Sequence, residues 1–517
     1  MANHIYVGIT IGPIYATLMR TSTPAGMWFV STMFSKVSEE LCKELVEKGL
    51  ERENIFSPYF GEDKKLLIPD GIGLYHDRIL FFTDSNFISK IPECIMAVKQ
   101  RIASYFDISL NENRIETNVE NSTEFIKEYL QIRYAYYQEE KFSPDVIFKL
   151  NHTLDVMELQ EGYIYQRDDE PLIKMLEGED EAGRNQKIKH SFLMAKDPAK
   201  PFKLKDNSIQ AQILRKDEFE IRNVKEIADL YGGYENSEEK CQKHFHYWAL
   251  VKADGDNMGK MLEKLTSIEE ITEFSYKCLQ YGSEAAELIG EKDGVTLYAG
   301  GDDLLFFAPA KDILSLCEDI NGIYHRIFDG FPQGEDKLTT LSIGVQICYY
   351  RYPLYEALAQ VSDLLNKAKA KGKNRIAVSL QKASGREIAF TLKHAEANDN
   401  QPDIMKLLID FLPKDNIGEY KVWLQSVLHT VIQYKSLFQE ALNHGVDMNI
   451  VFKNIFHHDV HHLEPSRKFL EKIVALFQAI HEEHKKEKNN NSTECVLERY
   501  ESLLRYIRFY MEKGEEK

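Results

Sequence analysis

Four aspartates stand beside glycines at two places in the second half of the chain. Asp254 and Asp256 belong to an Asp-Gly-Asp segment, and Asp302 and Asp303 end a Gly-Gly-Asp-Asp segment. Phosphoryl transfer by two divalent ions about 3.5 to 4 Å apart requires several carboxylates on rigid backbone. Oxygen ligands of this kind select Mg²⁺ or Mn²⁺ over zinc. The two segments therefore predict a two-metal site for nucleotidyl transfer.

The neighbouring residues suit a triphosphate. Gly255, Gly300 and Gly301 would let the backbone approach phosphate closely. Isolated Asp-Gly pairs mostly form solvated turns, and basic residues favour helix C-termini in any case. The joint occurrence of both aspartate segments at predicted strand ends favours a site. Positive charge that offsets phosphate is expected from Lys260 and from Lys369, Lys371, Lys373 and Arg375.

The elements around the aspartates explain how they would meet. Their predicted order is strand, helix, strand, strand, helix, strand, which is the ferredoxin-like arrangement of a palm core. The first strand then lies between two neighbours, so both aspartate segments converge on one sheet edge. An amphipathic helix from Leu354 to Ala368 follows and leads to the lysine cluster. The strands are predicted at 247–251, 295–299, 304–308 and 341–347, and the helices at 258–289 and 313–328.

The whole chain reads as an α+β protein with two palm-like domains, a helical insertion and a C-terminal helical bundle. Apolar runs at 5–11 and 78–83 indicate a first sheet, and strand signals fade after Gly385. The predicted divisions are a first, metal-free palm-like domain at 1–115, a mixed, partly helical segment at 116–240, a catalytic palm at 241–385 and a bundle at 386–517.

Composition narrows the possible partners and compartment. The 517 residues carry 82 acidic and 64 basic side chains, a formal net charge of -18, so RNA contacts must be local or shared with partners. Seven scattered cysteines without a C-x-x-C pair argue against a zinc site and suit a reducing cytoplasm. We expect neither export nor membrane insertion. The histidine-rich run 457–462 is interpreted as a solvated turn between helices.

Segments 249–260 and 298–305 resemble the first palm strand and the signature turn of a known family. This family is the large, Cas10-type subunit of type III-B (Cmr) CRISPR effector complexes. Residues 341–345 and 368–375 are also similar to the end of diguanylate cyclase domains, and residues 11–14 and 28–31 weakly resemble the family's metal-free first palm. Many members carry an N-terminal HD nuclease domain, which we expect this chain to lack.

The resemblance implies roles for particular residues. Asp254 and Asp303 would be the principal metal ligands, Asp302 and Asp256 would support them, and Lys369 would touch the triphosphate. It also implies a nucleotide pocket composed of both palms.

The same resemblance implies a function. Together with other Cmr subunits and guide CRISPR RNA, the protein would sense target RNA and use ATP to make a signalling nucleotide. The product would be cyclic oligoadenylate, or AMP joined to S-adenosylmethionine as a second substrate. Two alternatives are a free-standing cyclic dinucleotide synthase, favoured by the diguanylate cyclase-like ending, and a catalytically silent scaffold, against which the four carboxylates count.

Overall fold

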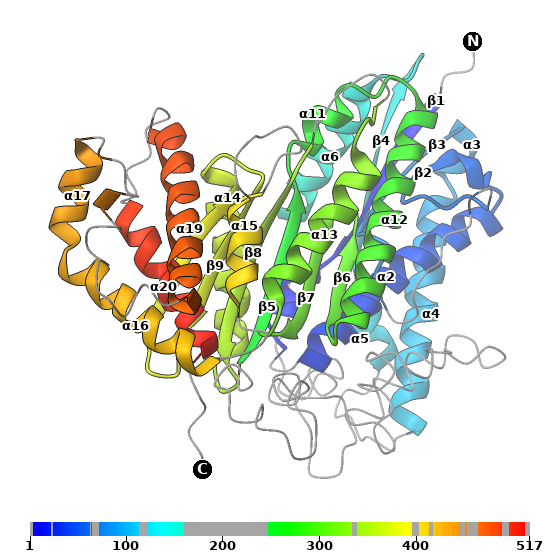
Figure 1. Ribbon diagram of the computed structural model, residues 1–517. Helices are drawn as coiled ribbons and strands as arrows, with labels where there is room; N and C mark the ends of the chain where they lie inside the picture. The colour runs from blue at the N-terminus through cyan, green and yellow to red at the C-terminus, as the bar shows by residue number, and fades with distance from the viewer. Residues whose placement is uncertain are drawn as a thin grey trace.

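The computed structural model contains two β-sheets with their helices and a group of C-terminal helices beside the second sheet (Figure 1). No helix in the described part of the chain is long and apolar enough to cross a membrane. The histidine-rich run 457–462 and most of the predicted insertion lie outside the described residues. The structure describes residues 4–21, 24–62, 64, 72–112, 122–159, 247–332, 339–394, 403–412, 417–444, 446, 450–451, 464–488 and 496–511.

The second sheet contains the predicted palm core. Its strand order is β10-β9-β8-β5-β7-β6, and β5 is antiparallel to both of its neighbours, β7 and β8. With helices α12 and α13 in the connections, this is the predicted ferredoxin-like order, which confirms the α+β palm fold. The bounds are β5 Tyr247–Gly255, α12 Ile268–Glu291, β6 Val295–Gly300, β7 Asp303–Pro309, α13 Ile313–Phe328, β8 Leu341–Tyr349, β9 Arg375–Gln381 and β10 Glu387–Lys393.

Both faces of this sheet are buried, because successive residues of a strand point to opposite sides. Ala249 and Val251 of β5 belong to the core formed with α12 and α13. Trp248 and Leu250 belong to a different core, which includes α2 (Pro24–Glu47) and the start of α14 (Leu354–Ala370). The helix α2 comes from the N-terminal part of the chain, so the two sheets share one apolar core.

The predicted single helix at 258–289 is wrong, because the structure has two helices there. Helix α11 (Met258–Leu262) ends early, and α12 begins after Ser267. The side chain of Ser267 accepts from the amide of Glu270, and the carboxylate of Glu270 accepts from the amide of Thr266 at 2.6 Å. This reciprocal capping starts a new helix.

The first sheet repeats the topology of the second. Its order is β2-β3-β1-β4, so its first strand is again central, and helices α2 and α4 occupy the corresponding connections. The predicted division at residue 115 is too early, because β4 completes this sheet. The bounds are β1 His4–Gly12, α1 Ile14–Leu18, a 3₁₀ turn Arg52–Asn54, β2 Ile55–Ser57, β3 Arg78–Thr83, α3 Ser85–Ile88, α4 Ile91–Glu112, α5 Ser122–Tyr129, β4 Gln131–Glu139 and α6 Pro144–Leu159.

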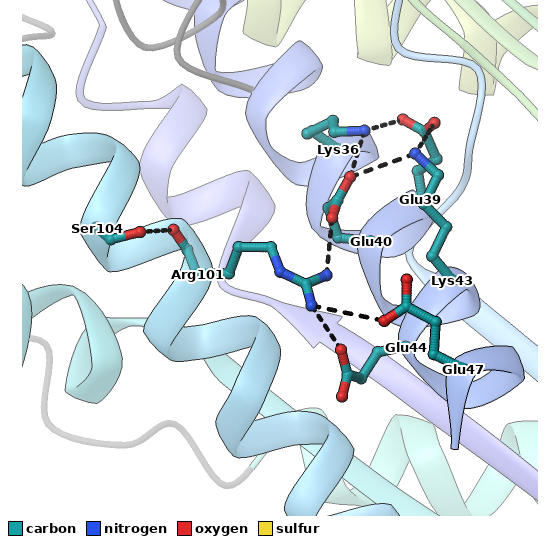
Figure 2. A network of polar contacts seen from close by, with 8 residues as sticks. All are labelled: Lys36, Glu39, Glu40, Lys43, Glu44, Glu47, Arg101 and Ser104. Atoms are coloured by element: carbon teal, nitrogen blue, oxygen red, sulfur yellow. Dashed lines mark hydrogen bonds and ion pairs between the residues drawn. The ribbon is translucent and has the colours of Figure 1, made fainter. Parts of the chain in front are cut away.

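A polar network joins α2 to α4 at one side of the shared core (Figure 2). Arg101 of α4 donates to Glu40 at 2.9 Å and to Glu44 at 2.6 Å, and both glutamates are largely buried on α2. Burial raises the pKa of Glu40, but the charges of Lys36 and Lys43 and the contact with Arg101 outweigh burial and lower it. These ion pairs connect α2 directly to α4.

The second sheet continues beyond the predicted boundary at residue 385. That boundary falls inside the antiparallel pair of β9 and β10, so the sheet ends only at Lys393. Helix α20 packs on β10, and α19 packs on α20 and α15. Tyr434 separates two of the bundle's helices, α16 and α17. The C-terminal bounds are α15 Ile404–Phe411, α16 Ile417–Gln433, α17 Lys435–Asn443, α19 Glu464–Lys488 and α20 Val496–Met511.

Gly344 of β8 allows α14 to lie directly on the sheet. A Cβ atom at this position would lie 2.6 Å from the carbonyl oxygen of Val361 and 2.7 Å from the amide nitrogen of Leu365. Because backbone atoms cannot yield as a side-chain tip can, we expect Gly344→Ala to lower the free energy of unfolding by about 1 to 3 kcal/mol, measured by urea denaturation.

Gly322→Ala is the matched control for that substitution. Gly322 is exposed on α13, and a Cβ atom there meets nothing within 4 Å. The helix propensity of alanine should stabilise this variant by up to about 1 kcal/mol. Equal stability of Gly344→Ala and the wild type would contradict the tight packing of α14 on β8.

Candidate functional site

The structure brings Asp254, Asp302 and Asp303 together where β5 ends and β6 turns into β7. Asp254 lies close enough to both other carboxyl groups to raise the pKa of each. The two segments approach closely, because a Cβ atom on Gly255 would lie 2.8 Å from Oδ2 of Asp302. Gly300 is the last residue of β6, and Gly301 stands in the turn that presents the aspartates.

Asp302 and Asp303 resist ionisation, because both carboxyl groups have a raised pKa. Burial, followed by the charges of Asp303 and Asp254, raises the pKa of Asp302 well above its ordinary value. Burial and Asp254 raise the pKa of Asp303 to about 7, against the opposing charges of Lys252 and Lys369. Lys252 of β5 was not among the residues predicted from the sequence. A cluster of this kind favours binding of positive charge.

Lys369 supplies one such charge from the end of α14. Its ammonium group forms an ion pair with Asp254 and lies 3.4 Å from the carbonyl oxygen of Gly255. Among the described residues, no three Asp, Glu, His or Cys side chains are already disposed around one point as metal ligands. The three aspartates nevertheless fit Mg²⁺ or Mn²⁺ in donor type, provided that Asp254 exchanges the ammonium group for the ion.

Asp256 has a different environment from the one predicted. Its carboxylate is fully buried and accepts from three donors: Thr340 Oγ1 at 2.7 Å, Ser342 Oγ, which lies 2.8 Å from both carboxylate oxygens, and the amide of Asn374 at 2.9 Å. It therefore joins β5, β8 and the turn before β9. The expectation that Asp256 binds metal does not fit this geometry, because ligation would break these contacts.

The basic residues predicted to bind phosphate lie in different surroundings in the structure and contact different partners. Arg375 is buried and donates to Glu483 of α19 at 3.0 Å, so it faces the C-terminal helices and does not fit the predicted phosphate contact. Lys373 donates to Asn257 Oδ1 at 2.6 Å. Lys260 is exposed on α11 and stays a candidate. Lys369, by contrast, contacts the aspartate cluster through Asp254.

A cavity of about 390 Å³ opens beside the aspartates and is lined by both domains. The second domain contributes the Gly-Gly-Asp-Asp turn and residues of α12. The first domain contributes polar side chains from β2, the segment before β3, the start of β3, and α6; they are Ser57, His76, Asp77, Arg78 and Asn151. The sequence resemblance implied such a shared pocket, but no motif identified these residues.

Residues 72–78 hold the first-domain wall of the cavity in place. Gly73 forms a parallel bridge with Tyr298 of β6, and its carbonyl accepts from the amide of Ala299 at 3.1 Å. On the other side, the amide of Tyr75 donates to Ser35 Oγ at 2.9 Å, and Ser38 of α2 donates to the carbonyl of His76 at 2.8 Å. This segment is thus fixed between α2 and the second sheet.

His76 is held neutral in this wall. Its Nδ1 accepts from the amide of Arg78 at 3.3 Å, so the ring proton belongs on Nε2, which lies 3.1 Å from Ser57 Oγ. Burial, together with the charge of Arg78, lowers the pKa of His76 to about 4. Since Ser57 accepts this proton, its own hydroxyl hydrogen is left for another acceptor.

The strand order and the carboxylate turn define a palm domain. Residues 247–377 match the family model described as the second palm domain of Cas10/Cmr2.

A curated relative is the CRISPR system Cmr subunit Cmr2 of Pyrococcus furiosus. It is 28% identical over 210 residues, which are 35% of this chain and 23% of that protein. The match therefore spans less than a quarter of the relative's length.

Solved structures show the same fold over most of the chain. A Csm1–Csm4 cassette in complex with cA4 has a TM-score of 0.55 at 14% identity and covers 99% of this chain and 70% of its own. A cassette in complex with one ATP gives 0.55 at 13% identity, with 98% and 70% coverage. The apo state of a type III-B Cmr-beta complex gives 0.56 at 11% identity, with 84% and 75% coverage.

The lowered pKa of His76 predicts a stability change with pH. Unfolded histidine has a pKa of 6.5, whereas folded His76 has one of about 4, so the unfolded state binds more protons between these values. The free energy of unfolding should therefore fall as pH falls from about 6.5 to 4, with His76 contributing about 2 kcal/mol. His76→Gln should reduce this dependence in urea titrations. An unchanged dependence would contradict a neutral, buried His76.

Proposed function

We propose that the chain is a nucleotidyltransferase subunit of a type III-B CRISPR complex and makes a signalling nucleotide from ATP. The observation that carries the proposal is the convergence of Asp254, Asp302 and Asp303 beside a cavity lined by two palm-type sheets. The structures of similar Csm1–Csm4 cassettes with one ATP or with cA4 support a nucleotide as the occupant of this site.

The proposed reaction joins the 3′-hydroxyl oxygen of one nucleotide to the α-phosphorus of ATP. The bond from that phosphorus to the β-phosphate bridging oxygen breaks, pyrophosphate leaves with the electron pair, and the hydroxyl proton passes to solvent. Two Mg²⁺ or Mn²⁺ ions held by Asp254, Asp302 and Asp303 would lower the pKa of the hydroxyl and neutralise the phosphates.

The chain's own residues prepare this reaction. Once metal ions compensate the aspartates, the Lys369 ammonium group would move from Asp254 to a phosphate oxygen. Its positive charge would then stabilise the negative charge of the phosphate. Lys252 would keep positive charge near Asp303. The cavity wall of residues 72–78 would hold the acceptor nucleotide against the turn and limit access of water. The reaction needs no covalent enzyme intermediate.

The proposed partners are guide CRISPR RNA, target RNA and other Cmr subunits, with target RNA switching on synthesis. The relationship to Cmr2 and the fold of the Cmr-beta subunit support this assembly. A net charge of -18 is consistent with RNA contacts that are local or shared with partner subunits.

Product analysis separates the candidate activities. The assembled complex is incubated with target RNA, Mg²⁺ or Mn²⁺, and ATP, with and without S-adenosylmethionine, and the products are identified by mass spectrometry. A product from ATP alone indicates an oligoadenylate synthase, and a product that requires both substrates indicates an adenylyl conjugating enzyme. A product from GTP alone would favour a cyclic dinucleotide synthase, and no product would favour a scaffold.

We expect Asp302→Ala with Asp303→Ala to lower synthesis by at least about 1000-fold, because the remaining Asp254 cannot hold the metal ions. Complex assembly, measured by size-exclusion chromatography, should persist, since both aspartates belong to a turn. Asp363→Ala is the matched control, because Asp363 is an exposed carboxylate on α14. Full synthesis by the double variant would overturn the proposed site.

Lys369→Met should change metal binding and synthesis in opposite directions. Without the competing ammonium group, Asp254 should bind Mn²⁺ about three- to tenfold more tightly in the absence of nucleotide, measured by electron paramagnetic resonance. Synthesis should fall, because the phosphate contact is lost. Weaker Mn²⁺ binding would show that Lys369 supports the aspartates instead of competing with metal.

A further inference from the structure

We infer that Glu483 in the C-terminal helix α19 is a positioning residue for the aspartate site. Through Arg375 it fixes the turn between α14 and β9, which in turn holds the segment that follows Asp254. Its effect on catalysis rests on the proposed function, whereas its effect on the turn does not.

A buried charged triad forms the far end of this connection. Glu483 accepts from Arg375 of β9 at 3.0 Å through one carboxylate oxygen and from Arg499 of α20 at 2.9 Å through the other. Arg499 also donates to the carbonyl of Thr391 in β10 at 3.1 Å. All three charged side chains are less than 10% exposed. One carboxylate thus anchors two helices of the bundle to two strands of the palm sheet.

The turn itself forms the near end of the connection. The amide of Asn374, next to Arg375, donates to Asp256 at 2.9 Å, and Lys373 donates to Asn257 at 2.6 Å. Both contacts hold the segment that carries Asp254. Lys369, on the other side of the turn, contacts Asp254 itself. The contacts of Lys373 and Asn374 therefore depend on where the turn lies.

The turn needs an external anchor because its backbone is strained. Lys373 has a φ of 65° and Asn374 a φ of 49°, both in the left-handed region that side chains disfavour. Such conformations persist only where surrounding contacts hold them. The contact from the amide of His394 to the carbonyl of Asn374, at 3.0 Å, is one such restraint, and the Arg375–Glu483 pair is the next one along the chain.

Glu483→Gln tests this inference, because it keeps the size of the side chain and removes its charge. Two buried guanidinium groups then lack their shared counter-charge, which should release Arg375. In hydrogen–deuterium exchange of the full-length protein, we expect exchange at the amide of Asn374 to become about tenfold faster. In the assembled complex we expect kcat for nucleotide synthesis to fall about tenfold, with a smaller change in KM for ATP.

Tyr500→Phe is the matched control within the same bundle. It removes one buried hydrogen bond, from Tyr500 to the carbonyl of Phe477 at 3.0 Å, without touching the turn. This variant should lower Tm and leave exchange at Asn374 and kcat unchanged. Glu483→Asp, which keeps the charge, should partly restore both quantities, and it also serves if Glu483→Gln fails to fold.

The outcomes separate the two proposals. Unchanged exchange at Asn374 in Glu483→Gln and Glu483→Asp would overturn the positioning role, whatever the activity. Faster exchange with a wild-type complex that makes no nucleotide would support the positioning role and count against the proposed function. Equal effects of Tyr500→Phe and Glu483→Gln on exchange would reduce Glu483 to a general stabiliser of the bundle.

Discussion

The structure depends on keeping three half-buried carboxyl groups close together. Burial and mutual repulsion raise the pKa of Asp302 and Asp303, so the folded chain holds these groups at a free-energy cost. Such a cluster persists only on backbone that cannot relax. The central position of β5, the close packing of α14 over Gly344 and the buried hydrogen bonds of Asp256 together provide that rigidity.

The shared core extends this rigidity to the first domain. Helix α2 lies between the two sheets and contributes to one continuous apolar cluster, while its paired charges face α4 (Figure 2). The cavity wall at 72–78 bonds to α2 on one side and to β6 on the other. Movement of one sheet against the other would therefore break buried contacts. Both domains together form the walls of the cavity, and neither domain forms it alone.

Local sequence pattern predicted the palm core well, since β5 and β8 are apolar strands buried on both faces and α13 buries one regular stripe of apolar residues. The position of Asp256 was not predictable in this way. Two residues apart on a strand, it should point to the same side as Asp254, but the chain leaves the strand after Gly255, and Asn257 adopts a φ of 61°. Asp256 consequently turns inward. The role of Arg375 depends on Glu483, which lies far away in sequence, and no local pattern contains that pairing.

The two sheets share a strand order, but they contribute different kinds of side chain to the site. At the position in β1 that corresponds to Asp254 in β5, the chain has Ile11, so this strand end carries no carboxylate. The first domain instead gives the cavity Ser57, Asn151 and neutral His76. In the proposed reaction, the aspartates with their metal ions and Lys369 would recognise phosphate, which all nucleoside triphosphates share. Discrimination between bases would then come from neutral donors and acceptors, and the first domain's wall supplies Ser57, His76 and Asn151 of this kind to the cavity.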